Sequence, residues 1–224
     1  ISQLIRTPTY SSNPQSLIFM SSLIDIMINY PENMSLISNT IITGGLGAMG
    51  RLVTKWVAFT ERYSRICLLS RRGRNRRNVK FMTSFDPRTN ALISLESKDC
   101  STSECMFDLQ LSSSVSGMRV FHAAGSLADS VFLRQNVGQF CFVCAGKSVS
   151  AKLMIDKISQ GFPLESLLMF SSTTALLGNP GQSPYGVANA AIESMSTSCT
   201  KKGMPIKSSQ FGALGGLSGM AVKK

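Results

Sequence analysis

A chain of 224 residues is long enough to bury one full core and short for two complete domains. Its longest apolar stretch near the N-terminus, 17–30, is broken by polar residues, falls short of the ~18–20 apolar residues of a membrane span, and lacks the basic leader of a signal peptide. The net charge of +11 owes much to a basic stretch at 71–80 without interleaved aromatic residues, so we expect neither a membrane nor a nucleic acid as partner.

The six cysteines are spread along the chain without the spacing of a disulfide or zinc framework. The only C-x-x-C pair is Cys141 with Cys144, and the only histidine is His122. No second pair is present to complete a tetrahedral zinc site. We therefore expect no bound metal ion, and we interpret the cysteines as reduced thiols.

The first 38 residues are rich in Ser, Asn and Pro, whereas from residue 39 short apolar runs alternate with stretches of helical spacing. Buried strands that alternate with helices predict an α/β fold with a doubly wound, mostly parallel sheet of the Rossmann type. The runs predicted as strands are 40–43, 66–70, 91–95, 119–122, 167–171 and 206–211. The predicted buried helix faces are Leu52, Trp56, Phe59 and Tyr63, and further on Leu153, Ile155 and Ile158.

A glycine cluster follows the first predicted strand and opens the first predicted helix. It runs from Thr43 to Gly50 and contains four glycines. Glycines permit a tight turn and a close approach of the backbone to a pyrophosphate, and the helix N-terminus supplies free N–H groups. This context predicts a dinucleotide-binding turn.

The end of the second predicted strand indicates which dinucleotide is bound. A site for NADH usually has an acidic residue there, but this strand ends in Ser70, Arg71 and Arg72. An arginine can bind the 2′-phosphate of NADPH with two hydrogen bonds, so NADPH is favoured over NADH. We predict Arg71 as the main phosphate ligand, with Arg72 or Arg74 sharing that role.

Two further side chains meet at the carboxyl edge of the predicted sheet. Ser172 ends the strand at 167–171, and Tyr185 follows thirteen residues later near the start of a helix. Ser183 and Pro184 are typical of an N-cap and a first helical residue. Asn189 stands one turn after Tyr185 and shares its face of the helix.

Taken together, these segments resemble the ketoreductase domain of modular polyketide synthases, a branch of the short-chain dehydrogenase/reductase superfamily. The matching segments run in the family's order and cover most of residues 39–221. They are ITGGLGAMG (42–50), LLSRRGR (68–74), FHAAGSLADS (121–130), FSSTTALLGNPGQSPYGVANAAIESM (170–195) and GMPIKSSQFGA (203–213). Ordinary short-chain dehydrogenases carry a lysine four residues after the tyrosine, whereas polyketide and animal-type fatty acid synthase ketoreductases resemble this chain in having an asparagine there and the lysine upstream.

The resemblance implies a catalytic set of Ser172, Tyr185, Asn189 and an upstream lysine. Lys147 stands about one residue farther from Ser172 than the family's pattern has it, and Lys152 is the other candidate. Tyr185 would protonate the developing alkoxide, with its pKa lowered by the lysine. Ser172 would donate a hydrogen bond to the substrate carbonyl, and Asn189 would keep the lysine aligned.

The resemblance also assigns binding residues around this set. The residues expected to bind NADPH are Thr43, Gly44, Gly45, Leu46, Gly47, Met49, Gly50, Ser70, Arg71, Arg72, Asp99, Cys100, Ala123, Ala124 and Gly125. The residues expected to contact substrate or set stereochemistry are Leu127, Asp129, Leu177 and Gln182. Asp129 matches the loop of ketoreductases that give the D-hydroxyl product, so the resemblance favours that product here. For His122 we expect a structural role.

The expected activity is NADPH-dependent reduction of a 3-ketoacyl thioester, held on an acyl carrier protein, in polyketide or fatty acid biosynthesis. We expect residues 39–224 to form the catalytic domain of a larger synthase, with other modules as partners and a cytoplasmic or organellar location. Residues 1–38 would be a linker or the tail of a non-catalytic structural subdomain. Two alternatives stay open, a catalytically silent domain of the same fold and a stand-alone short-chain dehydrogenase acting on a free carbonyl metabolite.

Overall fold

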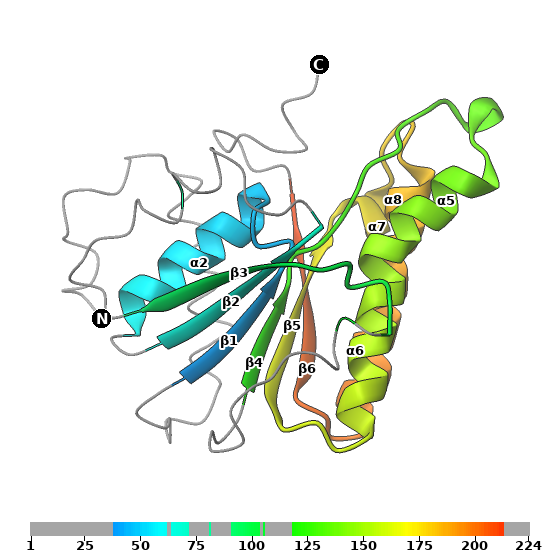
Figure 1. Cartoon of the computed structure of the whole chain (residues 1–224). Coiled ribbons are helices and arrows are strands. Elements are labelled where there is room, and N and C mark those ends of the chain that lie inside the picture. Colours follow the sequence, from blue (N-terminus) through cyan, green and yellow to red (C-terminus); the bar gives the residue numbers. More distant parts are fainter. Residues whose placement is uncertain are drawn as a thin grey trace, which may run out of the picture. The chain divides into compact units, whose positions relative to one another are not determined.

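The computed structural model describes residues 38–61, 64–71, 81, 91–103, 105 and 118–212. In this part of the chain, six strands form one sheet in the order β3-β2-β1-β4-β5-β6, with every neighbouring pair parallel (Figure 1). The strands are β1 (Ser38–Thr43), β2 (Ser64–Ser70), β3 (Leu92–Ser97), β4 (Met118–His122), β5 (Leu164–Ser172) and β6 (Ile206–Phe211). All six predicted strands are confirmed, with ends that differ by at most three residues.

Helices cover both faces of this sheet, so the fold is the doubly wound, Rossmann-like one expected (Figure 1). One face carries α2 (Ala48–Thr60), and the other carries the helices that follow β4. These are η1 (Phe132–Arg134), α5 (Val137–Cys144), η2 (Ala145–Val149), α6 (Ser150–Ser159), α7 (Thr174–Leu177) and α8 (Ser183–Lys201). None of the helices described here is long and apolar enough to cross a membrane.

The core lies on both faces of the sheet because successive residues of a strand point to opposite sides. In β4, Val120 belongs to a buried cluster with Met154 of α6 and Ile192 of α8. Its neighbour Phe121 meets Trp56 of α2 edge to face, with ring centroids 6.4 Å apart. The buried strands therefore fix both helical layers against one sheet.

Two local predictions about helices are wrong. The buried residues of α2 include Val53, Val57 and Trp56, whereas the Phe59 side chain is 44% exposed, because the stripe that faces the sheet starts one residue later than the pattern indicated. Tyr63 of the same predicted face lies outside the described residues. Ser183 is the first residue of α8 rather than its cap, and no side chain caps this helix.

The proposed boundary at residue 38 stays a prediction, because residues 1–37 and 213–224 lie outside the described part of the chain. The first strand that the structure describes is β1, where the first predicted strand was placed.

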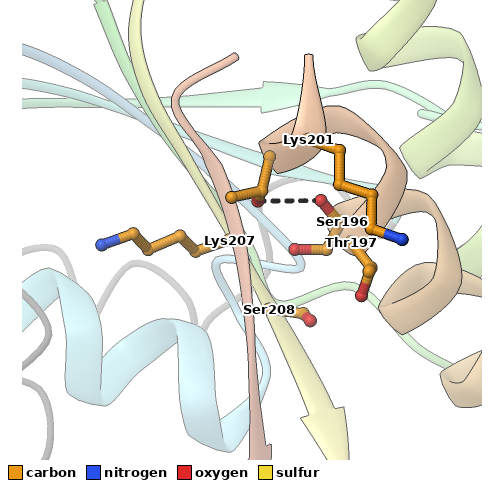
Figure 2. A pocket seen from close by; sticks show the side chains of 6 residues that line it. Ser196, Thr197, Lys201, Lys207 and Ser208 are labelled. Carbon is orange, nitrogen blue, oxygen red and sulfur yellow. Dashed lines mark hydrogen bonds between the residues drawn. The ribbon is translucent and has the colours of Figure 1, made fainter. Parts of the chain in front are cut away.

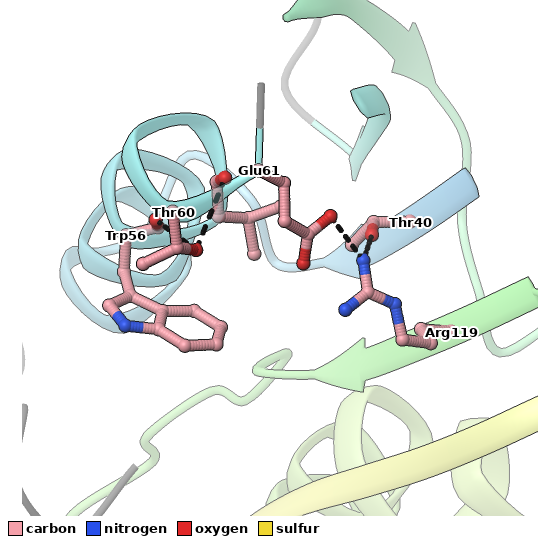
Figure 3. Close-up of polar contacts among 6 residues, drawn as sticks. Thr40, Trp56, Thr60, Glu61 and Arg119 are labelled. Atoms are coloured by element: carbon pink, nitrogen blue, oxygen red, sulfur yellow. Dashed lines mark hydrogen bonds and ion pairs between the residues drawn. The ribbon is translucent and has the colours of Figure 1, made fainter. Parts of the chain in front are cut away.

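A buried ion pair joins the start of the sheet to the end of α2 (Figure 3). Arg119 of β4 donates to the Glu61 carboxylate over 2.5 Å and to the Thr40 hydroxyl over 3.1 Å. The two charged side chains are only 4% and 13% exposed. Since the guanidinium has little contact with water, the carboxylate of Glu61 provides most of the stabilisation of its buried charge.

We predict that Glu61→Gln lowers the free energy of unfolding by about 3 kcal/mol, because it leaves the Arg119 charge buried without a counterion. Urea denaturation of the 224-residue chain measures this. Asp156→Asn is the matched control, because Asp156 forms an ion pair with Lys152 in which the side chains are 43% and 60% exposed. Its expected loss is below about 0.5 kcal/mol, and equal losses in the two variants would contradict the prediction.

Candidate active site

The glycine turn connects β1 to α2 with very close backbone contacts. Gly44 adopts a φ of +64°, and a Cβ there would lie 2.7 Å from the carbonyl oxygen of Ala123. A Cβ on Gly50 would lie 2.4 Å from the carbonyl oxygen of Gly44. Side chains at these positions would push the helix away from the strand, so the glycines allow α2 to begin directly at the sheet edge.

The N-terminus of α2 can receive an anion. Gly47 occupies the N-cap position and supplies no side-chain cap, and no acidic residue stands in the first turn. The N–H groups of the first turn of a helix have no partner within it, and they attract negative charge. Leu46 and Met49, two of the predicted binding residues, are half-buried on either side of Gly47.

Arg71 stands directly after Ser70, the last residue of β2. Its guanidinium donates to the Ser126 hydroxyl over 2.9 Å and lies 5.4 Å from the centre of the Phe142 ring. The side chain thus reaches from the end of β2 toward the segment that follows β4. Arg72 and Arg74 lie outside the described residues.

Asp99 and Cys100, the predicted adenine contacts, follow β3 and differ in exposure. Asp99 is exposed, and its carboxylate accepts hydrogen bonds from the amide and the hydroxyl of Ser101. Partial burial raises the Asp99 pKa, but these hydrogen bonds and the charge of Arg71 outweigh it, so the pKa is lowered overall. The Cys100 side chain packs in the core, with its sulfur 3.6 Å from the Cys105 sulfur.

The Ala123–Ala124–Gly125 segment after β4 lies against the glycine turn. The Ala123 amide donates to the Thr43 carbonyl over 3.1 Å, and the Ala124 amide donates to the Thr43 hydroxyl over 3.4 Å. The structure therefore brings the predicted cofactor-binding residues of β1 and β4 to one edge of the sheet.

The predicted catalytic side chains meet at the end of β5. The Ser172 hydroxyl contacts Thr174 at the start of α7, and the side chains of Ser172 and Asn189 face the Tyr185 hydroxyl. The Asn189 amide donates to the Tyr185 carbonyl over 2.7 Å. The buried Asn189 Oδ1 has no hydrogen-bond partner within the described part of the chain, so this atom is available to a donor supplied from elsewhere.

Lys147 joins this group from a π-helical turn between α5 and α6. The turn η2 contains one residue more than an α-helical turn, which accounts for the extra residue between Lys147 and Ser172. The Lys147 side chain is buried, and its ammonium donates to the Phe170 carbonyl over 2.6 Å and lies 5.8 Å from the centre of the Tyr185 ring. Lys152 instead forms an exposed ion pair with Asp156, so Lys147 is the lysine at the site.

Burial shifts the pKa of both reactive groups. It lowers the pKa of Lys147 to about 8. It raises the pKa of Tyr185, and the hydrogen bonds with Asn189 and Ser172, which act in the opposite direction, do not compensate. The expected lowering of the tyrosine pKa by the lysine is thus absent in this arrangement, because desolvation of the phenolate prevails.

Two loops flank the catalytic group, and they are tied together. The Gln182 amide donates to the Asp129 carboxylate over 3.0 Å, and the Ser130 amide donates to the Gly181 carbonyl over 3.1 Å. Leu127 is half-buried in the first loop, whereas the Leu177 side chain of α7 is 79% exposed. Of the four residues predicted to contact substrate, Asp129 and Gln182 are therefore joined directly by a hydrogen bond.

A hollow elsewhere on the described surface does not involve these residues (Figure 2). Its lining includes Thr200 and Lys201 of α8 with Lys207 of β6. It lies at the start of β6, whereas Ser172 pairs with Phe211 at the end of that strand. It is separate from the catalytic group.

Sequence reasoning missed the π-helical turn and the bonds of His122. The shifted spacing of Lys147 could have indicated the π-helical turn. Nothing in the sequence indicated the hydrogen bonds of His122, since a single histidine does not reveal its partners. The strand order, the glycine turn and the Ser–Tyr–Lys–Asn group define the class of protein as a short-chain dehydrogenase/reductase-type α/β fold.

The comparison with protein families narrows this class. Residues 38–216 match the KR domain family, so the chain belongs to the ketoreductase domains of polyketide synthases. The chain is 34% identical over 197 residues to a 6-methylsalicylic acid synthase of Arthrobotrys oligospora, a match that covers 81% of this chain and 11% of that synthase.

Solved ketoreductases share the fold. The first ketoreductase of the tylosin polyketide synthase is 28% identical with a TM-score of 0.72, and the match covers 84% of this chain and 40% of that one. An A-type ketoreductase from a modular polyketide synthase has a TM-score of 0.76 at 23% identity, covering 87% of this chain and 41% of that one. The chain thus spans 11% of the 6-methylsalicylic acid synthase and about two fifths of each of these two solved structures.

The buried lysine predicts a pH dependence of stability. Lys147 has a pKa of about 8 when folded, against an ordinary value of 10.5, so between these values the unfolded chain binds more protons than the folded one. The free energy of unfolding should therefore rise with pH across this window, by up to about 3 kcal/mol. Denaturation at a series of pH values, compared with Lys147→Met, measures this. A difference between the two proteins that does not change with pH would contradict the prediction.

Proposed function

We propose that this domain reduces a 3-ketoacyl thioester, carried on an acyl carrier protein, to the 3-hydroxyacyl thioester with NADPH during polyketide synthesis. The observation that carries the proposal is the meeting of Ser172, Tyr185, Lys147 and Asn189 beside the glycine turn. Membership of the KR domain family supports it.

The residues of the groove fit a phosphorylated dinucleotide. The uncapped N-terminus of α2 offers amide donors to a pyrophosphate, and Arg71 offers a guanidinium to a 2′-phosphate. Asp99 stays ionised, as an acceptor for an adenine amino group requires. The buried Asn189 Oδ1, without a partner among the described residues, fits a ribose hydroxyl or a water. When bound, NADPH would supply the hydride.

Tyr185 is the proton donor of the proposed reaction. Its raised pKa keeps the phenol protonated at neutral pH, so the proton is available to the oxygen of the substrate carbonyl as negative charge develops there. Ser172 donates a hydrogen bond to the same oxygen. The Lys147 ammonium is the cationic group beside this proton donor, 5.8 Å from the Tyr185 ring centre.

Within this proposal, the position of Lys147 argues against a silent domain. The extra residue before Ser172, which motivated that alternative, is absorbed by η2 and leaves the ammonium beside Tyr185. A stand-alone enzyme for free ketones would not need the exposed apolar side chains of η1 and α7, where Phe132, Leu133 and Leu176 are at least 74% exposed. These side chains suit an acyl chain or a partner domain, and the match of Asp129 to the loop of ketoreductases that give the D-hydroxyl product favours that product.

The catalytic assignment predicts the effect of two substitutions on NADPH consumption with a short 3-ketoacyl thioester. Tyr185→Phe removes the proton donor and should lower kcat by about 100-fold to 10,000-fold. Ser172→Ala removes one donor to the carbonyl and should lower kcat by about 100-fold. Ser171→Ala is the matched control, because Ser171 points to the other face of β5 and bonds Glu193. Equal losses in the two serine variants would contradict the assignment.

The assignment of Arg71 predicts a selective loss of NADPH affinity. Arg71→Ala removes a charge-assisted hydrogen bond to the 2′-phosphate, so the Kd for NADPH should rise by about tenfold to a hundredfold while that for NADH stays the same. Fluorescence titration of both cofactors measures this. Arg65→Ala, at the other end of the same strand, should change neither Kd. A parallel loss for both cofactors in Arg71→Ala would contradict the phosphate role.

A further inference from the structure

His122 is fully buried at the end of β4, and each ring nitrogen has a partner on a different element. Its Nδ1 lies 2.7 Å from the Thr43 hydroxyl oxygen, at the end of β1. Its Nε2 lies 2.9 Å from the carbonyl oxygen of Lys147, in the π-helical turn η2. One side chain therefore connects the glycine turn to the segment that carries the active-site lysine.

The chemistry of these partners defines the tautomer. A carbonyl oxygen only accepts hydrogen bonds, so Nε2 carries the hydrogen and donates it to Lys147. Burial, together with the nearby Lys147 charge, lowers the pKa of His122 to about 3, so the ring is neutral and Nδ1 accepts the Thr43 hydroxyl hydrogen. The Thr43 oxygen accepts in turn from the Ala124 amide. The hydrogen bonds thus run in one direction from Ala124 through Thr43 and His122 to Lys147.

The π-helical turn needs this support at its carbonyls. A π turn places its side chains differently from an α-helical turn, and it is found as a single inserted turn at functional sites. The Lys147 carbonyl accepts from His122 Nε2, from the Ser150 hydroxyl at 3.1 Å and from the Ser150 amide. If the turn relaxed to an α-helix, the Lys147 side chain would rotate away from Phe170 and Tyr185.

We propose that His122 is a positioning residue that holds the π-helical turn and thereby keeps the Lys147 ammonium at the catalytic group. This rests on the proposed reductase function for its effect on turnover. This role is more specific than a general structural one, because it depends on the Nε2 atom, which is directed at Lys147.

Two substitutions distinguish the hydrogen bond of Nε2 from that of Nδ1. In His122→Gln the side-chain amide nitrogen lies near the position of Nε2 and can donate to the Lys147 carbonyl. In His122→Asn the side-chain oxygen lies near the position of Nδ1 and can accept from Thr43, while the donor to Lys147 is lost. Both replace a buried ring by a smaller amide, so both lose packing, and they differ mainly in which partner they keep.

The first experiment compares kcat and cofactor affinity per folded molecule in the two variants. His122→Asn should lower kcat at least tenfold and change the Kd for NADPH less than threefold. His122→Gln should restore most of kcat. Equal kcat values in the two variants, or losses that follow stability alone as measured by denaturation, would overturn the positioning role.

The second experiment does not depend on turnover. In protein with carbon-13 at the lysine ε-carbons, the Lys147 signal, assigned by its absence in Lys147→Met, should titrate near pH 8 in the wild type and in His122→Gln. In His122→Asn it should titrate at higher pH, as the ammonium leaves its buried position. An unchanged titration in His122→Asn overturns the inference. If the titration is shifted in His122→Asn but the wild-type chain shows no turnover, the positioning role is supported and the proposed reaction is refuted.

Discussion

Parallel pairing of β1 with β4, and of β4 with β5, brings the carboxyl ends of the central strands to one edge of the sheet. Thr43 lies opposite His122, and His122 lies opposite Met169, so the glycine turn, the loop after β4 and the end of β5 are separated by single strand spacings. The proposed cofactor groove and the catalytic group both depend on this alignment, because neither is built from one continuous segment.

Burial is the second constraint on the site. Desolvation lowers the pKa of the buried Lys147 ammonium and raises that of the half-buried Tyr185. The two shifts oppose the formation of a Lys–Tyr ion pair in the resting protein. They leave the tyrosine protonated, which is the state that a proton donor for carbonyl reduction needs.

Much of the fold follows from local pattern, whereas most of the candidate site was implied by the resemblance to ketoreductase domains. Apolar runs bounded by polar segments are sufficient to place buried strands, and all six predicted strands are present. The apolar pattern predicted less well which side of α2 faces the sheet, because Phe59 was predicted to be buried and is exposed. A periodic pattern gives spacing along a helix, but which of two adjacent stripes meets the sheet is decided by packing.

The amino-acid sequence by itself determined the α/β class, the glycine turn at Thr43–Gly50 and the spacing of Ser172, Tyr185 and Asn189, since these depend on short-range backbone preferences. Only the tertiary structure decided between Lys147 and Lys152, buried the Cys100 side chain in the core, and joined His122 to both Thr43 and Lys147. Those outcomes depend on contacts between segments far apart in the chain, which a local sequence pattern does not specify.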